Sequence, residues 1–272
     1  MRTDLMGLPV DILSRDETVA RAERAMRTGE PCQHVALNVA KLVNARRNPE
    51  LDRDIRDADV VGIDGMGIAW TLWLMGERGV SRVTGIDLFE TLMELCAAKG
   101  YRPFLLGATP EVLERAEVEL RRRHPALVIA GSHHGYFKLE DEAELCSRIA
   151  ASGAHCLFVA MPTPHKERFM LRNRTRLGVP FAMGIGGTLD VVAGKVRRAP
   201  KAMQALGLEW AYRLAQEPRR LAARYLDTNA VFAGLLLVEV WSRLTGRSGG
   251  TRGHDAPPAM GPAGSARHPP RG

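Results

Sequence analysis

The sequence predicts an α/β protein in which helices flank a Rossmann-like, mainly parallel β-sheet. Short apolar runs alternate with amphipathic helical stretches through most of the 272 residues, and this alternation is typical of βαβ units. Polar or glycine-rich segments follow several of the apolar runs, as expected where parallel strands end. Basic helical stretches and then a segment of Gly, Pro, Arg and Ser follow. We therefore predict an α/β core (1–194), a basic helical appendage (195–244) and a disordered tail (245–272).

The individual elements follow from capping residues and periodicity. Apolar positions recur at helical spacing over 85–100, where Asp87 is the predicted N-cap and Gly100 ends the helix. Thr109 is the predicted cap of the next helix, which has Pro110 in its first turn. The predicted strands are "HVALNV" (34–39), "ADVVGID" (58–64), "RPFLLGA", "ALVIAGSHHGYF", "CLFVAMP" and "PFAMGIGG". The other predicted helices are "AKLVNARRN", which stops near Pro49, "GMGIAWTLWLMG", and segments around 140–151 and 165–176.

The C-terminal quarter carries the basicity of the chain. The formal net charge is +7, of which residues 195–244 contribute +5 and the tail +3, leaving −1 for the core. Such an end suits phosphates, whether of nucleic acid, an anionic bilayer or a lipid-linked substrate. Its helices are predicted to break at Pro200 and Pro218. The apolar stretch 229–241 is shorter than the ~20 residues of a membrane span, which leaves a core helix or a helix at a membrane interface.

Other features limit the function classes. The four cysteines stand at irregular spacing without a CxxC pair, which argues against a zinc site or a disulfide framework and fits a reducing cytosol. The first residues carry acids and a proline where a secretory signal needs an apolar run, so we expect no export. His133 and His134 have no third ligand nearby at metal spacing, so we predict neither a metal nor a cofactor.

Polar and glycine residues at the predicted strand ends are the first candidates for a binding site. Ligands of open α/β sheets collect beyond the carboxyl ends of the strands, and glycines let backbone N–H groups approach a phosphate. A nucleotide-type ligand is therefore a reasonable hypothesis, although each loop alone is better explained as a turn. Asp64 taken singly is likewise explained as a turn residue, and Arg82 as a surface cation. The strand-end candidates are Asn38, Asp64 with Gly65, Gly107 with Ala108 and Thr109, and the run Gly184–Gly187, which includes Gly186.

Seven motifs in a fixed order carry a resemblance to a known family. They are "LNVAKLVNARRNPEL", "ADVVGIDGMGIAW", "RVTGIDL", "FLLGATPEV", "HHGYF", "GIGGTLDVVAGKVRRAP" and "LGLEWAYRLAQEPRRLAARYL". Over about residues 30–226 the chain resembles the WecG/TagA/CpsF glycosyltransferases. The resemblance implies metal-independent, inverting transfer from a UDP-sugar to a polyprenyl-diphosphate-linked saccharide. It also implies exopolysaccharide, capsule or wall-polymer synthesis by a cytoplasmic protein that is peripheral on the anionic inner face of the cell membrane.

The resemblance also implies roles for individual residues. The aspartate of the family's D-G-x-G segment falls on Asp64, the implied catalytic base, which would take the proton of the attacking hydroxyl opposite the leaving UDP. The arginine of R-V-T-G falls on Arg82, whose forked donors suit diphosphate oxygens. The appendage arginines implied to close over the site are Arg213, Arg219, Arg220 and Arg224, for which a solvated helix face is the plainer alternative. The further substrate-binding candidates are Asn38, Gly65, Thr84, Asp87, Gly107, Lys166, Glu167, Gly186 and Gly187.

Two departures from the family pattern leave alternatives open. Ala36 stands where members often carry threonine, and Lys166 stands where many carry glutamine. Because a lysine can bind phosphate or a donor carboxylate, the donor sugar stays open, with N-acetylmannosaminyl and glucosyl transfer both considered. The departures also give modest support to a catalytically inactive nucleotide-sugar-binding protein, whereas the presence of Asp64 and Arg82 argues against it. Nucleic-acid binding ranks low because the basic segment contains no recognised nucleic-acid-reading module. The apolar face of the appendage leaves open a homo-oligomer or a lipid contact.

Overall fold

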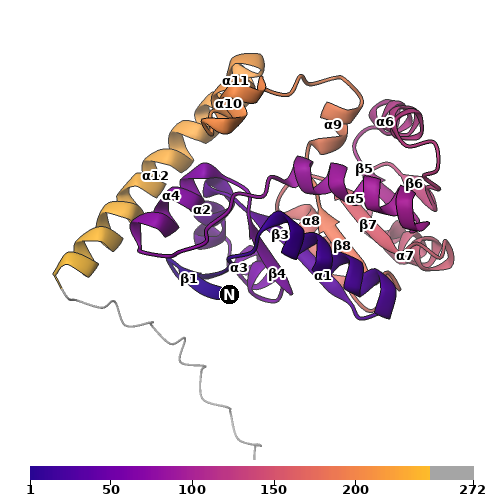
Figure 1. Ribbon diagram of the computed structural model, residues 1–272, viewed down its shortest axis with the longest axis horizontal. Coiled ribbons are helices and arrows are strands. Elements are labelled where there is room, and N and C mark those ends of the chain that lie inside the picture. Colours follow the sequence, from indigo (N-terminus) through magenta and orange to yellow (C-terminus); the bar gives the residue numbers. More distant parts are fainter. Residues whose placement is uncertain (246–272) are drawn as a thin grey trace, which may run out of the picture.

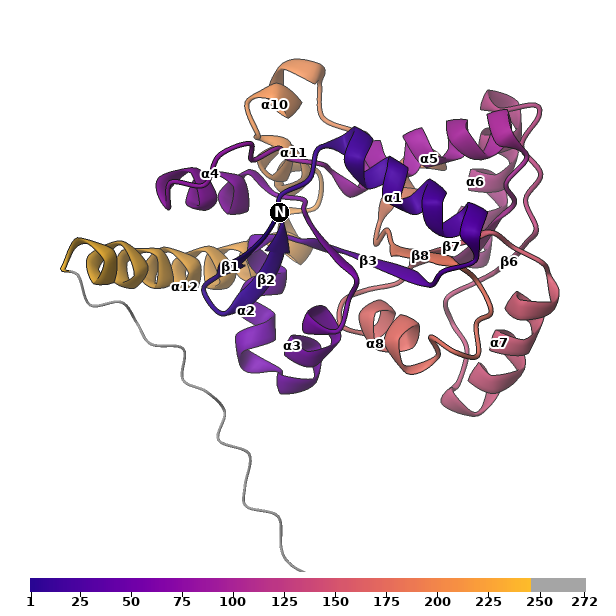
Figure 2. The same ribbon diagram turned by 60° about the horizontal axis from the view of Figure 1, so that its bottom comes forward.

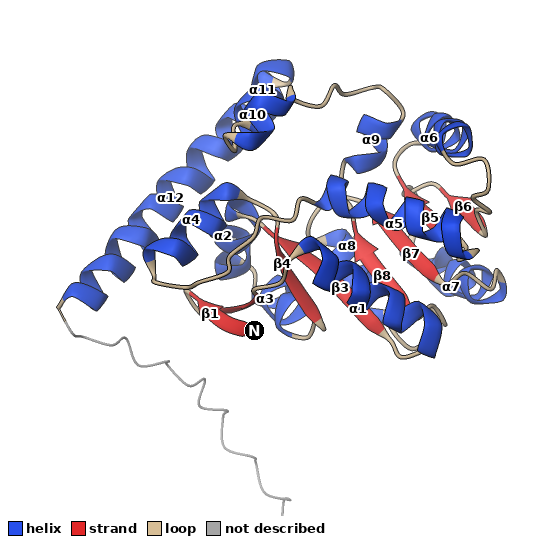
Figure 3. Ribbon diagram, viewed as in Figure 1, coloured by secondary structure: helices blue, strands red, loops and turns tan. Residues whose placement is uncertain are grey.

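Six parallel strands form the central sheet of the computed structural model, which describes residues 1–245 (Figures 1 and 3). The side chains of Arg220, Arg224 and residues 242–244 lie outside this description, as does the predicted disorder of 246–272. The strand order is β4-β3-β8-β7-β5-β6, and the predicted α/β fold class is confirmed. The strands are β3 (Cys32–Leu37), β4 (Val60–Ile63), β5 (Pro103–Gly107), β6 (Gly131–His133), β7 (Cys156–Ala160) and β8 (Phe181–Gly184).

The register of the sheet brings two predicted residues together. Leu37 of β3 is paired with Ile63 of β4 in a parallel ladder. The next residue of each strand is therefore Asn38 or Asp64, and the two lie side by side at the carboxyl edge of the sheet. Neighbouring strands are about 4.8 Å apart, so Gly107 at the end of β5, four strands from β4, lies roughly 19 Å along this edge.

Helices cover both faces of the sheet, because its strands are apolar on both sides (Figure 2). One face carries α1 (Arg15–Thr28), α5 (Gly85–Lys99) and α6 (Pro110–Arg123), with the short α9 (Thr188–Val192) packed in the same core cluster. The other face carries α2 (Val39–Arg47), α3 (Pro49–Arg56), α7 (Glu142–Ala151) and α8 (His165–Arg172). A short 3₁₀ turn, η1 (Leu139–Asp141), precedes α7.

An N-terminal hairpin, β1 (Arg2–Leu5) and β2 (Leu8–Asp11), covers the β4 edge of the sheet. The buried Asp11 carboxylate binds the Arg2 guanidinium at 2.8 Å and accepts a hydrogen bond from the backbone N–H of Val61 at 2.8 Å. The N–H of Val61 is thus satisfied by a side chain instead of a further strand. A covered edge of this kind does not invite pairing with another chain.

Several predicted boundaries were wrong, each for a local reason. The strand predicted at 34–39 is Cys32–Leu37, because Asn38 leaves the ladder to cap α2. The long strand predicted over 126–137 reduces to Gly131–His133. The predicted N-cap Asp87 lies three residues inside α5; the cap is Thr84, whose hydroxyl accepts from the backbone N–H of Asp87. Pro49 starts a new helix, α3, because Asn48 caps it.

The C-terminal segment forms α10 (Lys201–Ala205), α11 (Glu209–Gln216) and α12 (Pro218–Leu244), with the predicted breaks at Pro200 and Pro218. The apolar stretch is part of a 27-residue helix, so the argument that it is too short for a span was wrong. Leu221–Trp241, 21 residues, is by length and composition alone sufficient to cross a bilayer, and 18% of its apolar window is buried. Helix α12 lies along α2 and α4 (Met66–Leu74), and Arg47 on α2 forms an ion pair with Asp227 on α12 (Figure 1).

Candidate functional site

Asp64 lies at the carboxyl end of β4 with both carboxylate oxygens oriented by neighbours. Its Oδ1 accepts a hydrogen bond at 2.9 Å from the backbone N–H of Gly85, the first residue of α5. Its Oδ2 is 3.4 Å from the side-chain amide of Asn38, which also caps α2. The side chain is half-buried and therefore reachable from solvent. The N-terminal end of α5 and the Asn38 amide thus hold a carboxylate in place at the edge where ligands of such sheets bind.

The glycines after Asp64 have a packing role of their own. A Cβ atom on Gly67 would lie 2.6 Å from Cγ2 of Val39, and one on Gly65 would lie 3.4 Å from Cβ of Asn38. Both positions therefore let the first turns of α2 and α4 approach each other closely. The absence of side chains here is explained by helix packing, and it also leaves the mouth of the site free of bulk.

A buried triad of charges, Lys41–Glu167–Lys166, lies beside Asp64. Oε1 of Glu167 is 2.7 Å from Nζ of Lys41 and 2.9 Å from Nζ of Lys166. Lys41 also donates to the carbonyl of Ala36 at 2.6 Å, and Lys166 donates to the hydroxyl of Thr163. The three charged side chains are almost completely buried, so two cations share one carboxylate in a low-dielectric environment.

The electrostatics of this triad follow from its composition. Burial lowers the pKa of Lys166 to about 8, and the positive charge of Lys41 acts in the same direction, whereas the charges of Glu167 and Asp64 oppose it. Burial alone would raise the pKa of Glu167, but Lys41 and Lys166 outweigh it and lower that pKa to about 2. Cδ of Lys166 would lie 2.9 Å from a Cβ on Gly184, so the lysine chain lies across the end of β8. The excess positive charge of the triad thus faces the strand ends.

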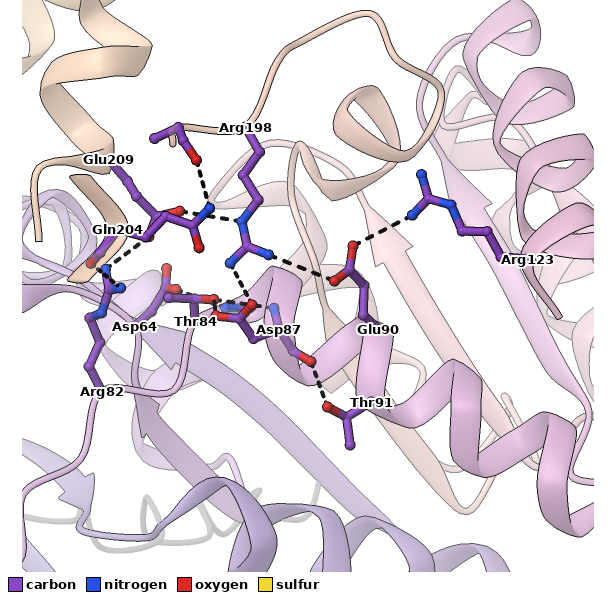
Figure 4. A network of polar contacts seen from close by, with 12 residues as sticks. Asp64, Arg82, Thr84, Asp87, Glu90, Thr91, Arg123, Arg198, Gln204 and Glu209 are labelled. Atoms are coloured by element: carbon purple, nitrogen blue, oxygen red, sulfur yellow. Dashed lines mark hydrogen bonds and ion pairs between the residues drawn. The ribbon is translucent and has the colours of Figure 1, made fainter. Parts of the chain in front are cut away.

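Arg82 lies near Asp64 and is held by the C-terminal segment (Figure 4). Its guanidinium donates to the carboxylate of Glu209 and to the backbone carbonyl of Gln204, each at 2.9 Å. Arg198 approaches the same carboxylate at 3.5 Å and forms an ion pair with Asp87. The Glu209 carboxylate is thus bound to the Arg82 guanidinium, the group that is predicted to bind a diphosphate.

Thr84 caps α5, and Asp87 lies in its first turn. The Thr84 hydroxyl donates to the Asp87 carboxylate at 2.6 Å, and Arg198 also binds that carboxylate. Burial, the largest influence, raises the pKa of Asp87, but these hydrogen bonds and the charge of Arg198 together lower it. A hollow of about 300 Å³ is lined by Arg82, Thr84 and Asp87 together with residues 14–16. A larger hollow of about 610 Å³ beside α6 contains none of the predicted site residues.

The predicted glycines farther along the edge have different surroundings. Gly107 has φ of 125°, and a Cβ there would lie 2.5 Å from the carbonyl oxygen of Ala160 on β7, so close backbone approach alone explains it. Gly186 has φ of 53° with open space beside it. At Gly187 a Cβ would lie 2.5 Å from Nη2 of Arg213, so this arginine of α11 reaches over the loop after β8.

The appendage arginines are placed unequally. Arg213 contacts the site edge, and its buried Nε has no hydrogen-bond partner among the described residues. Arg219 is exposed in the first turn of α12, and the side chains of Arg220 and Arg224 lie outside the described part of the chain. His133 binds the carbonyl of its neighbour His134. Over residues 1–245 no three or more His, Cys, Asp or Glu side chains are grouped so that they could hold a metal ion.

Four residues that contact the predicted site residues were missed by the sequence analysis: Lys41, Arg198, Gln204 and Glu209. All four stand in or next to the motifs quoted above. Their role depends on tertiary contacts, since Arg82 and Glu209 are 127 positions apart in the sequence. A charged residue within a helical pattern is normally predicted to face solvent, and nothing local distinguishes Lys41 from such a residue.

The comparison with known families agrees with this geometry. The sequence model described as "Glycosyl transferase WecG/TagA/CpsF family" matches residues 3–246. The match covers the α/β sheet, the strand-end residues and the C-terminal helices, and it extends the resemblance to the N-terminal hairpin. The chain therefore belongs to the WecG/TagA/CpsF family of glycosyl transferases.

Proposed function

We propose that this glycosyl transferase moves a sugar from a UDP-sugar to a polyprenyl-diphosphate-linked saccharide, with inversion at the anomeric carbon. The product would be an intermediate of exopolysaccharide, capsule or wall-polymer synthesis. The observation that supports this most is that Asp64 and Arg82 both lie near the N-terminus of α5 (Figure 4). A carboxylate and a guanidinium at one strand edge supply a base for the acceptor and a cation for the leaving group.

In the proposed step, Asp64 takes the proton of the acceptor hydroxyl as its oxygen attacks the anomeric carbon of the donor. The bond from that carbon to the phosphate oxygen breaks at the same time, and the electron pair leaves with UDP. Negative charge grows on the diphosphate, and fixed cations stabilise it. Arg82, Arg198 and Arg213 are described arginines at this edge, and the N-terminal turn of α5 adds backbone donors.

A panel of UDP-sugars tested against a synthetic polyprenyl-diphosphate-sugar examines the proposal as a whole. The expected result is release of UDP with one donor and a product whose new linkage, read by NMR, has inverted anomeric configuration. Retained configuration would contradict the direct displacement. UDP binding without release for every donor would instead favour the inactive nucleotide-sugar-binding protein. The panel should include donors with a negatively charged group, because the ammonium of Lys166 lies beside Asp64.

Glu209→Gln is expected to tighten UDP binding about 1.5- to 5-fold. Glu209 forms an ion pair with the Arg82 guanidinium, and a bound diphosphate must break this pair to contact Arg82. Ion pairs near a surface are worth about 0.2–1 kcal/mol, which sets the size of the expected effect. Titration calorimetry with UDP measures the effect, and Glu114→Gln on the exposed face of α6 is the charge-matched control. Unchanged or weaker UDP binding in Glu209→Gln would show that Arg82 does not receive the diphosphate.

The proposed membrane contact of residues 195–244 gives a further prediction. Replacing Arg219, Arg220 and Arg224 with alanine is expected to weaken binding to anionic vesicles at least tenfold at low salt, since each Arg near anionic lipid contributes about 1 kcal/mol. Use of a vesicle-embedded acceptor should fall with it, and the melting temperature should change little. The control variant removes the same charge from α6, at Arg121, Arg122 and Arg123. Equal vesicle binding by both variants would contradict docking through α12.

A further inference from the structure

All four tryptophans of the chain are exposed, although tryptophan is a largely buried residue type in most proteins. Trp70 and Trp73 on α4 are 52% and 47% exposed, Trp210 on α11 is 47% exposed, and Trp241 on α12 is 67% exposed. Three helices from distant parts of the sequence thus present the whole tryptophan content of the protein to solvent. Exposed apolar side chains that gather in one region mark a contact surface.

The three helices adjoin one another around the start of α4. A Cβ on Gly207, in the turn between α10 and α11, would clash with Cγ of Met66, and one on Gly67 would lie 3.8 Å from Cε1 of Phe232 on α12. Ile68 and Leu72 of α4 share a core cluster with Phe232. Both views show α4 beside α12, and α10 and α11 near the N-terminal end of α12 (Figures 1 and 2).

Helix α4 is apolar on its outer face as well as its inner face. The segment Met66–Leu74 contains no charged residue, and its inner face is formed by buried side chains such as Ile68 and Leu72. Its outer face is formed by Trp70, Trp73 and Leu74, of which Leu74 is 62% exposed. The distal part of α12 likewise exposes Leu237, Val238 and Trp241. We name Trp70, Trp73, Leu74, Trp210, Leu237, Val238 and Trp241 the tryptophan face.

The net charge of the segment that carries α11 and α12 indicates the partner of the tryptophan face. The appendage that carries α11 and α12 (195–244) has a net charge of +5 over its length. Arg78, four residues after the end of α4, is exposed. Two copies of the chain would bring like charges together on this face, whereas an anionic bilayer complements them. Tryptophan rings are amphipathic and prefer the boundary between lipid headgroups and acyl chains, and basic residues beside them add electrostatic attraction.

We propose that α4 is a membrane-docking element of the α/β core itself, and that the tryptophan face rests on an anionic bilayer. This inference rests on the proposed function in one respect, which is that the acceptor is anchored in lipid. Asp64 lies two residues before α4, so a bilayer touching Trp70 and Trp73 places lipid-linked sugars next to the carboxylate. The core therefore contacts the membrane directly and is not only tethered by the C-terminal segment.

Co-sedimentation of the full chain with phosphatidylglycerol–phosphatidylcholine vesicles tests this surface. The variant Trp70→Ala/Trp73→Ala is expected to bind at least tenfold more weakly than the wild type at low salt. The control is Val118→Ala, which removes an exposed apolar side chain from α6. Thermal melts should show both variants folded, and the less disruptive Trp70→Gln/Trp73→Gln variant replaces the alanine pair if its melt is lowered. Vesicle binding by the folded tryptophan variant equal to that of Val118→Ala would overturn the proposal. So would loss of a dimer in sedimentation velocity without loss of vesicle binding.

Two activity measurements separate this inference from the proposed function. With a short-chain, water-soluble acceptor analogue, the tryptophan variant should release UDP at the wild-type rate. With the acceptor embedded in vesicles, its rate should fall at least tenfold. An equal loss with both acceptors would contradict the docking role, because the defect would then lie in the site. If the wild type releases no UDP with either acceptor but still binds vesicles through Trp70 and Trp73, the proposed function fails and the docking surface stands.

Discussion

Asp64→Asn is expected to lower sugar transfer about 10²–10⁴-fold, the usual contribution of a positioned general base. Asparagine has the same shape and keeps an oxygen for the Gly85 N–H, but it does not take a proton at neutral pH. The substitution weakens only the long contact of 3.4 Å between the Asn38 amide and Oδ2 of residue 64. The fold should therefore be unchanged. The measurement is the turnover number for UDP release with saturating donor and acceptor.

Two controls make the Asp64 result specific. UDP should bind to Asp64→Asn at least as tightly as to the wild type, because a negative charge near the diphosphate is removed. Asp57→Asn, at the exposed C-terminal end of α3, should have wild-type turnover. A turnover number for Asp64→Asn within a few-fold of the wild-type value would exclude Asp64 as the base. Weaker UDP binding with unchanged turnover would assign it to donor binding instead.

Glu167→Gln is expected to lower the free energy of unfolding by about 3–5 kcal/mol, the usual cost of breaking a buried ion pair from one side. Both Lys41 and Lys166 contact this carboxylate, and all three side chains are buried. The amide leaves two ammonium groups in a low-dielectric site with no anion in direct contact. Urea denaturation of both proteins measures the difference, and Glu140→Gln, on the exposed turn before α7, should change it by less than about 0.5 kcal/mol.

The pH dependence of stability gives a second readout of the same carboxylate. The pKa of Glu167 is lowered in the folded protein to about 2 from an ordinary value of 4.5. Its contribution to stability is therefore fully present above about pH 4.5 and is lost as the pH falls towards about 2. The wild type should lose stability more steeply than Glu167→Gln across this window. Parallel curves, or a Glu167→Gln variant as stable as the wild type, would contradict the triad as described.

The fold was largely predictable because its signals are local and repeated. Apolar runs alternating with helical stretches correctly predicted the parallel sheet, and Asn38 and Asp64 were both named as strand-end residues, but only the register places them side by side. The N-terminal hairpin escaped prediction because its strands are four residues each and partly polar. Helix α1 was also missed, although Ser14 and Glu17 form a capping box that a sequence can reveal.

The site was predictable only in part, because charge pairing depends on the tertiary structure. The motifs single out Asp64 and Arg82, but they do not reveal that Glu209 forms an ion pair with Arg82. Lys166 and Glu167 were predicted as substrate-binding residues, whereas Lys41, their buried partner, looks like any lysine on an amphipathic helix. The length of α12 was underestimated because its first turns are basic, and composition alone separates them from the apolar part.

The most direct test of the central claim is a crystal structure of Asp64→Asn with a UDP-sugar and an acceptor analogue bound. The account predicts that the attacking hydroxyl lies about 3 Å from the carboxamide oxygen of residue 64, on the face of the sugar opposite the diphosphate. The diphosphate should contact Arg82, with Glu209 displaced. A hydroxyl beyond direct or single-water reach of residue 64, or a diphosphate bound away from Arg82, would contradict it.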